Sequence, residues 1–138
     1  MRGILAIAAA IVAVSCSAYA DDAKPSGGGT TVSAPIVFFD IAGPDAAKLR
    51  SFYGSIFGWT ISDQNAIKTP SLEGTFRQDP AEKILYMGVP DINAALKQIT
   101  DAGGKVVLPR TVVPNVTIFA LFTDPAGNRM GLVEIPAK

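Results

Sequence analysis

The spacing of apolar residues between residue 36 and residue 61 changes in a way that predicts a strand, a helix and a second strand. Ile36–Ile41 is a run of β-branched and aromatic residues, which is typical of a strand. From Ala46 to Phe57 apolar residues recur every three or four positions, which predicts a helix. Asp45 can cap the start of this helix, and Gly58 ends it. The apolar helix face is expected to consist of Leu49, Phe52, Tyr53 and Ile56.

The rest of the chain repeats this order of elements. Short extended segments complete the first half at Trp59–Ile61, Ala66–Thr69 and Leu72–Arg77. A strand at Ile84–Val89 then precedes a second helix, which begins at Pro90 and Asp91 and ends at Gly103 and Gly104. The apolar face of the second helix consists of Ile92, Ala95, Leu96 and Ile99. The last strands are expected at Lys105–Leu108, Thr117–Thr123 and Arg129–Ile135, with a turn at residues 124–128.

A shift of about 46 residues superimposes the two halves. It pairs Phe38 with Ile84, Pro44 with Pro90, Asp45 with Asp91 and Gly58 with Gly104. Self-similarity at a fixed period indicates an internal duplication, in which each half is one strand–helix–strand–strand–strand unit. Residues 78–83 join the two units.

The N-terminal residues predict an export signal. Arg2 precedes an apolar run from Ile4 to Val14, and Ala18 and Ala20 then form a cleavage pattern of small residues. The run is shorter than the roughly twenty residues that span a bilayer. We therefore expect a signal peptide at residues 1–20 and a periplasmic or secreted protein. A lipoprotein anchor on Cys16 is the alternative. Its match to the bacterial lipoprotein signal is poor, because Ala13 stands at the position where leucine is expected.

Residues 21–34 are polar and glycine-rich, which predicts a flexible tether in front of one domain at residues 35–138. The chain has twelve basic and twelve acidic residues without any basic cluster, so the sequence offers no footprint for nucleic acid. It contains no histidine, and its single cysteine, Cys16, lies in the predicted signal. Histidine-based dyads and thiolate chemistry are therefore excluded from the mature domain.

Three segments resemble the vicinal-oxygen-chelate superfamily, which includes glyoxalase I, bleomycin-resistance proteins and extradiol dioxygenases. They are the stretches FYGSIFGW from Phe52, AGGKV from Ala102 and FALFTDPAGNRMGL from Phe119. The resemblance runs from about Ile36 to Ile135. It implies an α+β fold, in which two tandem βαβββ modules form a cup-shaped mixed sheet with the helices outside.

Metal-using members are similar in placing four ligands inside the cup, on the first and last strands of each module. Carried onto this sequence, those positions are Phe38, Gly74, Ile84 and Gly131. None of these side chains can bind a metal, and the histidine that zinc, iron and nickel prefer is absent. The nearest carboxylates are Glu73 and Glu134. Each is an odd number of residues from a ligand position, so each is expected to face away as a solvated side chain.

The strand period predicts which side chains line the cup. Residues two apart share a face, so Phe38 and Asp40 lie together, as do Ile84 and Tyr86. These four residues predict an apolar floor with one acid and one phenol, which is a typical composition for a small-molecule pocket. The alternative interpretation is that Phe38 and Ile84 fill the cup as core while Asp40 binds a backbone amide.

The leading hypothesis is an exported, metal-free domain that binds a small organic molecule in its cup and carries no cofactor. The second hypothesis is an enzyme of the family, a glyoxalase- or dioxygenase-like lyase, isomerase or oxygenase with an unusual metal site. An interaction protein with a filled cup is the third. The resemblance also implies a homodimer, and nothing beyond the signal indicates a membrane span. The sequence indicates no catalytic residue.

Overall fold

A computed structural model describes residues 33–136 of the chain. The predicted signal peptide with Cys16, and all but the last two residues of the predicted tether, lie outside these residues. The first half contains β1 (Ile36–Gly43), α2 (Ala46–Phe57), β2 (Thr60–Ile61), β3 (Ala66–Lys68) and β4 (Glu73–Gln78). The second half contains β5 (Glu82–Val89), α3 (Ile92–Asp101), β6 (Lys105–Val113), β7 (Thr117–Thr123) and β8 (Arg129–Glu134).

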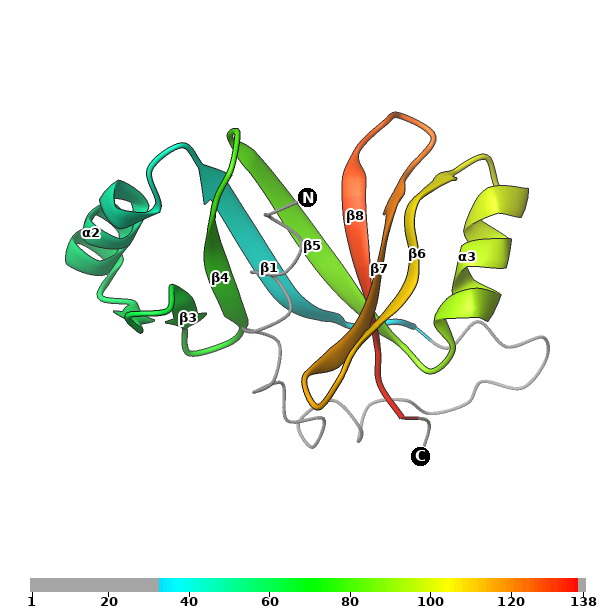
Figure 1. The fold of residues 1–138 in the computed structure, drawn as a ribbon, viewed down its shortest axis with the longest axis horizontal. Coiled ribbons are helices and arrows are strands. Elements are labelled where there is room, and N and C mark those ends of the chain that lie inside the picture. The colour runs from blue at the N-terminus through cyan, green and yellow to red at the C-terminus, as the bar shows by residue number, and fades with distance from the viewer. Residues whose placement is uncertain (1–32, 137–138) are drawn as a thin grey trace.

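The eight strands form one sheet in the order β2-β3-β4-β1-β5-β8-β7-β6. The first strands of the two halves, β1 and β5, lie at its centre and pair antiparallel (Figure 1). Within each half the first strand pairs in parallel with the last, β1 with β4 and β5 with β8. The predicted α+β fold with a mixed, cup-like sheet is confirmed. Both halves have the predicted order of elements, while the duplication event itself stays a prediction.

Both helices begin at the residues that the sequence predicts. The Asp45 carboxylate accepts a hydrogen bond from the Lys48 amide at 3.1 Å, and the Asp91 carboxylate accepts one from the Ala94 amide at 3.0 Å. Each bond satisfies an amide in the first turn that has no partner within its helix. At the other end of α2, Gly58 takes the left-handed conformation (φ 64°) that a residue with a side chain adopts only at a cost.

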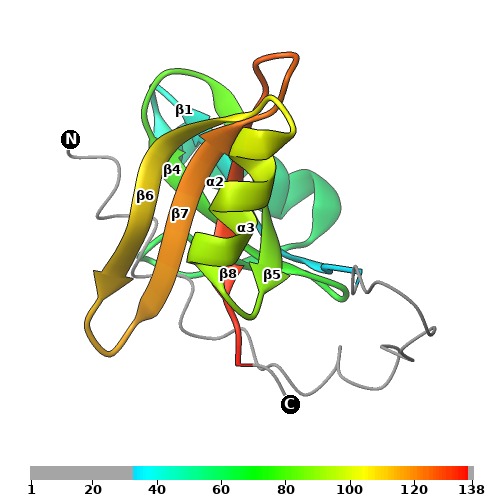
Figure 2. The same cartoon turned by 90° about the vertical axis from the view of Figure 1, so that its right-hand side faces the viewer.

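The two helices pack against the same face of the sheet, here called the helix face. Successive side chains of a strand point to opposite faces, so Phe39 and Ile41 of β1 share a face with Met87 of β5. Phe39 and Ile41 pack in the core under α2, and Met87 packs in the core under α3. The predicted apolar face of α3 is confirmed, because Ile92, Ala95, Leu96 and Ile99 all belong to that core. Figure 2 shows α3 lying along β6 and β7.

The predicted apolar face of α2 is only half correct. Leu49 and Tyr53 pack against the sheet, whereas Phe52 and Ile56 are 53% and 58% exposed. The reason is the size of the surface underneath. β2 and β3 have only two and three residues, while β6 and β7 beneath α3 have nine and seven. α2 packs on β1, on β4 and on the two-residue β2, and this narrow edge of the sheet leaves Phe52 and Ile56 uncovered.

The opposite face of the sheet, here called the inner face, carries the largest buried side chains. Its core contains Phe38 from β1, Ile84 and Tyr86 from β5, Phe119 and Leu121 from β7, and Val133 from β8. Side chains from the β6 arm of the sheet (Leu108, Val113 and Val116) pack against this cluster. The curved sheet therefore closes over its own inner face on the side of the second half.

Glu134 ties three elements together on the helix face. Its two carboxylate oxygens accept hydrogen bonds from Nε and Nη2 of Arg110 on β6, at 2.8 and 2.6 Å. The amide of Ile92, at the start of α3, donates to the same carboxylate at 3.1 Å. The bonds from Arg110 are the main cause of a Glu134 pKa below the ordinary value, and partial burial opposes them. The expectation that Glu134 is a solvated side chain is therefore wrong.

Replacing Glu134 with glutamine should lower the free energy of unfolding by about 1 kcal/mol at pH 7, because a charge-assisted pair at a partly exposed site is lost. A lowered carboxylate pKa contributes stability above the unfolded pKa of 4.5 and loses it as the pH falls through the folded pKa. The difference between wild type and Glu134→Gln should therefore shrink from pH 7 to pH 3. Urea unfolding at both values measures it, with Glu73→Gln as the control. A difference independent of pH would show that the charge of Glu134 contributes nothing.

Candidate functional site

The four residues predicted to line the cup lie together at the centre of the inner face. Phe38 is opposite Tyr86 and Asp40 is opposite Ile84 in the antiparallel pairing of β1 and β5. The rings of Phe38 and Tyr86 meet edge to face with their centroids 5.7 Å apart. All four residues are at most 1% exposed, and side chains of β7 pack against the three apolar ones. No contact in the structure tests their role in ligand binding, which stays a prediction.

Asp40 is held by side chains rather than by a backbone amide. Nε of Arg77 donates to Asp40 Oδ2 at 3.3 Å, and Nη2 of Arg77 lies 3.4 Å from Oδ1. The Tyr86 hydroxyl donates to Oδ2 at 3.4 Å. The side chains of Asp40 and Arg77 are 0% and 4% exposed, so this ion pair is buried. The paired charges satisfy one another inside the sheet.

Burial shapes the protonation of this cluster. Removal from water raises the pKa of the Asp40 carboxyl above its ordinary value, and the adjacent Arg77 guanidinium opposes that rise. Burial also raises the pKa of the Tyr86 hydroxyl, and the Asp40 charge raises it further. Tyr86 therefore keeps its proton and acts as a hydrogen-bond donor. A phenol held in this state is not a base at neutral pH.

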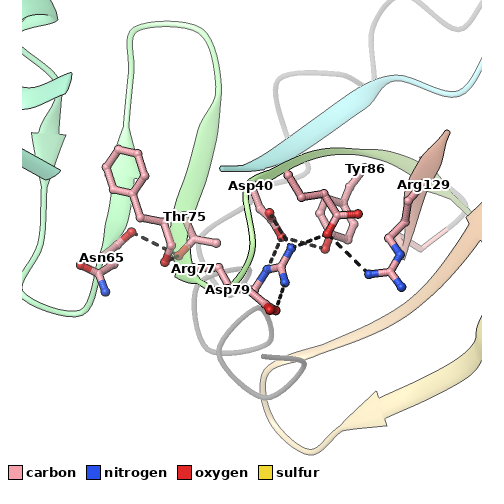
Figure 3. Close-up of polar contacts among 9 residues, drawn as sticks. Asp40, Asn65, Thr75, Arg77, Asp79, Tyr86 and Arg129 are labelled. Carbon is pink, nitrogen blue, oxygen red and sulfur yellow. Dashed lines mark hydrogen bonds and ion pairs between the residues drawn. The ribbon is translucent and has the colours of Figure 1, made fainter. Parts of the chain in front are cut away.

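The cluster continues outward to the rim of the sheet. Arg77 also pairs with Asp79, and its Nη2 donates to Glu82 Oε2 at 3.0 Å. Glu82 in turn lies 3.5 Å from Nη1 of Arg129 on β8. Figure 3 shows the Arg77 guanidinium between Asp40 and Asp79. Two guanidinium groups and three carboxylates therefore connect β1, β4, β5 and β8 in one network.

Gly131 has a specific packing role on β8. It pairs with Tyr86 in the parallel register of β5 and β8. A Cβ atom built on Gly131 would lie 2.1 Å from Cδ1 of Tyr86, far inside van der Waals contact. The tyrosine ring therefore occupies the space that a side chain at residue 131 would need.

Gly74 lies on the helix face and not in the cup. A Cβ atom on Gly74 would lie 2.7 Å from the ring of Phe39, whose side chain packs on the α2 side. Alternation along β4 puts Glu73 and Thr75 on the inner face instead, with Thr75 opposite Asp40. The predicted ligand position at Gly74 is therefore wrong, and so is the expectation that Glu73 faces away from the cup. Both errors come from a shift of one residue along β4, which exchanges the two faces of the strand. The Thr75 hydroxyl donates a hydrogen bond to the Asn65 carbonyl oxygen at 3.2 Å.

A shallow groove opens on the helix face, behind the packed inner face. Its volume is about 480 Å³. Its floor is formed by Phe39 and Ile41 of β1 with Leu85 and Lys83 of β5, which pair across the two strands. The walls are formed by Trp59 and by residues 69–72, the segment between β3 and β4. Trp59 is fixed by stacking on Tyr53 at 5.2 Å and by an edge contact with Phe39 at 5.8 Å.

Comparison with known families decides the identity of this fold. Residues 35–132 match the family model described as the Glyoxalase/Bleomycin resistance protein/Dioxygenase superfamily. The chain belongs to this superfamily. The resemblance that the sequence carries is thereby confirmed.

The curated relatives that the chain matches are distant and longer. The "Anthracycline biosynthesis protein DnrV" of Streptomyces peucetius is 27% identical over 121 residues, which cover 65% of this chain and 43% of that protein. The "Putative glyoxylase CFP32" of Mycobacterium tuberculosis (strain CDC 1551 / Oshkosh) is 24% identical over 111 residues, covering 67% of this chain and 42% of that protein. The chain thus spans less than half the length of the curated relatives it matches.

Solved structures support the fold alone. A superfamily member from Vibrio splendidus 12B01 superimposes with a TM-score of 0.56 at 9% identity, over 75% of this chain and 100% of that chain. Within residues 33–136, no helix has the length and apolar character needed to cross a membrane.

The side chains of this superfamily member do not fit the metal that the resemblance implies. The ligand positions on the inner face are Phe38, Ile84 and Gly131, which have no side-chain donor atom, and Thr75, whose hydroxyl is bonded to protein. No group of three or more histidine, cysteine or carboxylate side chains in the described part of the chain could hold a metal ion. Chelation by these positions would first require the Tyr86 ring to leave Gly131.

Sequence reasoning did not find two features of this site. Arg77 is the counter-ion of Asp40, and the alternation of Glu73, Thr75 and Arg77 with Gly74 and Phe76 was the available signal that Arg77 faces inward. The groove was missed because its floor joins strands β1 and β5, whose paired residues are far apart in the sequence, and its walls come from a third region between them. Its aromatic wall at Trp59 lies next to a glycine helix end, where the sequence predicts only a short strand.

Proposed function

We propose that this chain is an exported, small-molecule-binding domain of the superfamily that works without a bound metal. The observation that carries the proposal is the contact between Tyr86 and Gly131, because the ring fills the position at which a last-strand ligand would reach into the cup. Phe38 and Ile84, at the first-strand positions, add apolar surface and no donor atoms. Such positions disfavour metal-assisted chemistry.

The relatives support a role with small molecules. One is named for anthracycline biosynthesis and another for glyoxylase activity, and both names concern small organic compounds. The match covers less than half of each relative, so the activity of the whole relatives is not carried over.

A thermal-shift screen of small aromatic and cationic or anionic compounds tests binding, using the purified protein from residue 21 onward. At a ligand concentration one hundred times Kd, binding to the folded state alone stabilises it by about 2.7 kcal/mol, which raises the melting temperature by roughly ten degrees. We expect at least one compound class to raise the melting temperature. If no compound shifts it at millimolar concentration, the binding function is wrong and the domain is better explained as an interaction protein.

The cup residues Phe38, Asp40, Ile84 and Tyr86 are one candidate binding site for the ligand. A compound there would have to displace the β7 side chains that pack on them and compete with Arg77 for Asp40. Asp40→Asn should then abolish the shift that the compound causes. A ligand that stabilises wild type and Asp40→Asn equally does not bind in the cup.

Export rests on the sequence of residues 1–20, which precede the described part of the chain. Protein recovered from its native cells should begin at Asp21. A mass that includes a diacylglycerol on Cys16 would instead make it a lipoprotein.

A further inference from the structure

We propose that the groove on the helix face is the ligand-binding site, and that it binds a small, flat, largely apolar molecule bearing a carboxylate or a similar anionic group. This inference rests on the proposed binding function and names its ligand class. The groove lies between Trp59 and β5, on the opposite side of the sheet from the cup residues.

The floor of the groove calls for an apolar ligand body. Phe39, Ile41 and Leu85 present side chains from adjacent strands, and Leu85 is 40% exposed although it is a large apolar residue at the centre of the sheet. Covering that surface removes apolar area from water, which is favourable. Phe39 and Trp59 are already fixed against one another, so they offer a rigid aromatic corner for a flat ring at little cost in side-chain entropy.

The charge at the rim selects an anion. Lys83 lines the groove and is exposed, and its side-chain ammonium makes no hydrogen bond or ion pair within residues 33–136. Asp40, the other charged residue of the lining, directs its carboxylate to the inner face, where Arg77 neutralises it. Of the two charged residues that line the groove, Lys83 is therefore the one whose charged group is available to a ligand. An anionic group placed beside it would lie at the polar edge of an apolar floor.

The size of the groove limits the ligand. A volume of about 480 Å³ falls within the range of known small-molecule sites, about 300–1,000 Å³. A bicyclic aromatic carboxylate is of a size that fits this volume. The segment between β3 and β4, with Thr69 and Leu72, closes one side of the groove and bounds the ligand there.

The chain provides its own probe, because Trp59 is its single tryptophan and forms a wall of the groove. We suggest measuring Trp59 fluorescence during titration with 2-naphthoate, indole-3-acetate and cinnamate, each beside its neutral amide. The carboxylates should quench Trp59 and bind more tightly than the amides. Backbone amide shifts of residues 83–85 in nuclear magnetic resonance spectra should move with the same Kd.

Three variants separate the contributions. Lys83→Met keeps the apolar stem and should weaken the carboxylates about three- to tenfold while leaving the amides unchanged. Leu85→Ser should weaken carboxylates and amides alike. Lys105→Met removes one equivalent positive charge from β6, outside the groove, and should change neither. Melting temperatures of the three variants confirm that each one folds.

Each other outcome identifies what is wrong. Equal loss of carboxylate and amide affinity in Lys83→Met would overturn the anionic ligand class. A screened compound that leaves Trp59 unchanged and requires Asp40 would place the ligand in the cup, which overturns the groove and keeps the binding function. A concentration-dependent dimer that Leu85→Ser dissociates, without any ligand effect, would assign the groove to a second copy of the chain. Absence of binding by every compound would overturn both the groove and the proposed function.

Discussion

Gly131→Ala should lower the free energy of unfolding by about 1–3 kcal/mol, although it adds a single methyl group. The new Cβ would lie 2.1 Å from Cδ1 and 2.3 Å from Cε1 of Tyr86, so the ring has to move. Tyr86 is fully buried between Phe38 and the β7 side chains, and its hydroxyl is bonded to Asp40. Moving the ring therefore disturbs both the core and the buried ion pair. Urea unfolding of the purified variant measures the loss.

Gly54→Ala is the matched control for this prediction. Its new Cβ would meet Ile61 at an ordinary 3.5 Å, and a helical alanine is favoured over glycine by about 0.5–1 kcal/mol. This control should be neutral or slightly stabilising. In the double variant Gly131→Ala with Tyr86→Ala, the destabilisation should be smaller than the sum of the two single changes, because Tyr86→Ala removes all three ring atoms that the new Cβ would meet. Strict additivity would show that Tyr86 does not occupy the space at residue 131.

Arg77→Met should cost about 3–5 kcal/mol at pH 7, because it leaves the buried Asp40 carboxylate with only the Tyr86 hydroxyl as a partner. Asp40→Asn should cost less, since Arg77 keeps Asp79 and Glu82. The order of the two effects is the specific expectation. Lys97→Met, which breaks an exposed pair with Asp101, should change stability by well under 1 kcal/mol. If Asp40→Asn is the more damaging change, the network is not organised around Arg77.

The loss in Arg77→Met should also depend on pH. The folded-state pKa of Asp40 is already above its unfolded value of 3.8 because of burial, so the contribution of this group to stability falls as the pH rises through the folded pKa. Removing the guanidinium raises that pKa further. The penalty of Arg77→Met should therefore be largest at pH 7 and shrink toward pH 4, where Asp40 can take up a proton. Unfolding curves at both pH values measure this.

Local patterns predicted most of the elements but not how they meet. Asp45, Asp91 and Gly58 mark helix ends because their effects on the backbone are local. Strand alternation placed Phe38, Asp40, Ile84 and Tyr86 on one face correctly. The partner of Asp40 depends on the parallel register of β1 with β4, which joins segments more than thirty residues apart, and no local pattern contains it.

The sequence predictions failed where the outcome depends on the exact strand register or on the extent of a packing surface. A shift of one position at Gly74 reversed the faces of Gly74 and Glu73, since the strand period is two. Phe52 and Ile56 are exposed although they belong to the apolar stripe of α2. Such a stripe predicts which side chains can pack, but it does not predict how much of the sheet lies beneath the helix. The groove required Trp59, Lys83 and Leu85 to be brought together by tertiary pairing.

A metal titration of the chelator-treated protein tests the central claim most directly. Zinc, nickel, manganese and ferrous ions would be added separately while melting temperature and stoichiometry are measured. Because Phe38, Ile84 and Gly131 offer no donor atoms and Tyr86 covers Gly131, we predict that no ion binds in a one-to-one ratio or raises the melting temperature at micromolar concentration. Tight binding of one ion per chain with a higher melting temperature would contradict the account.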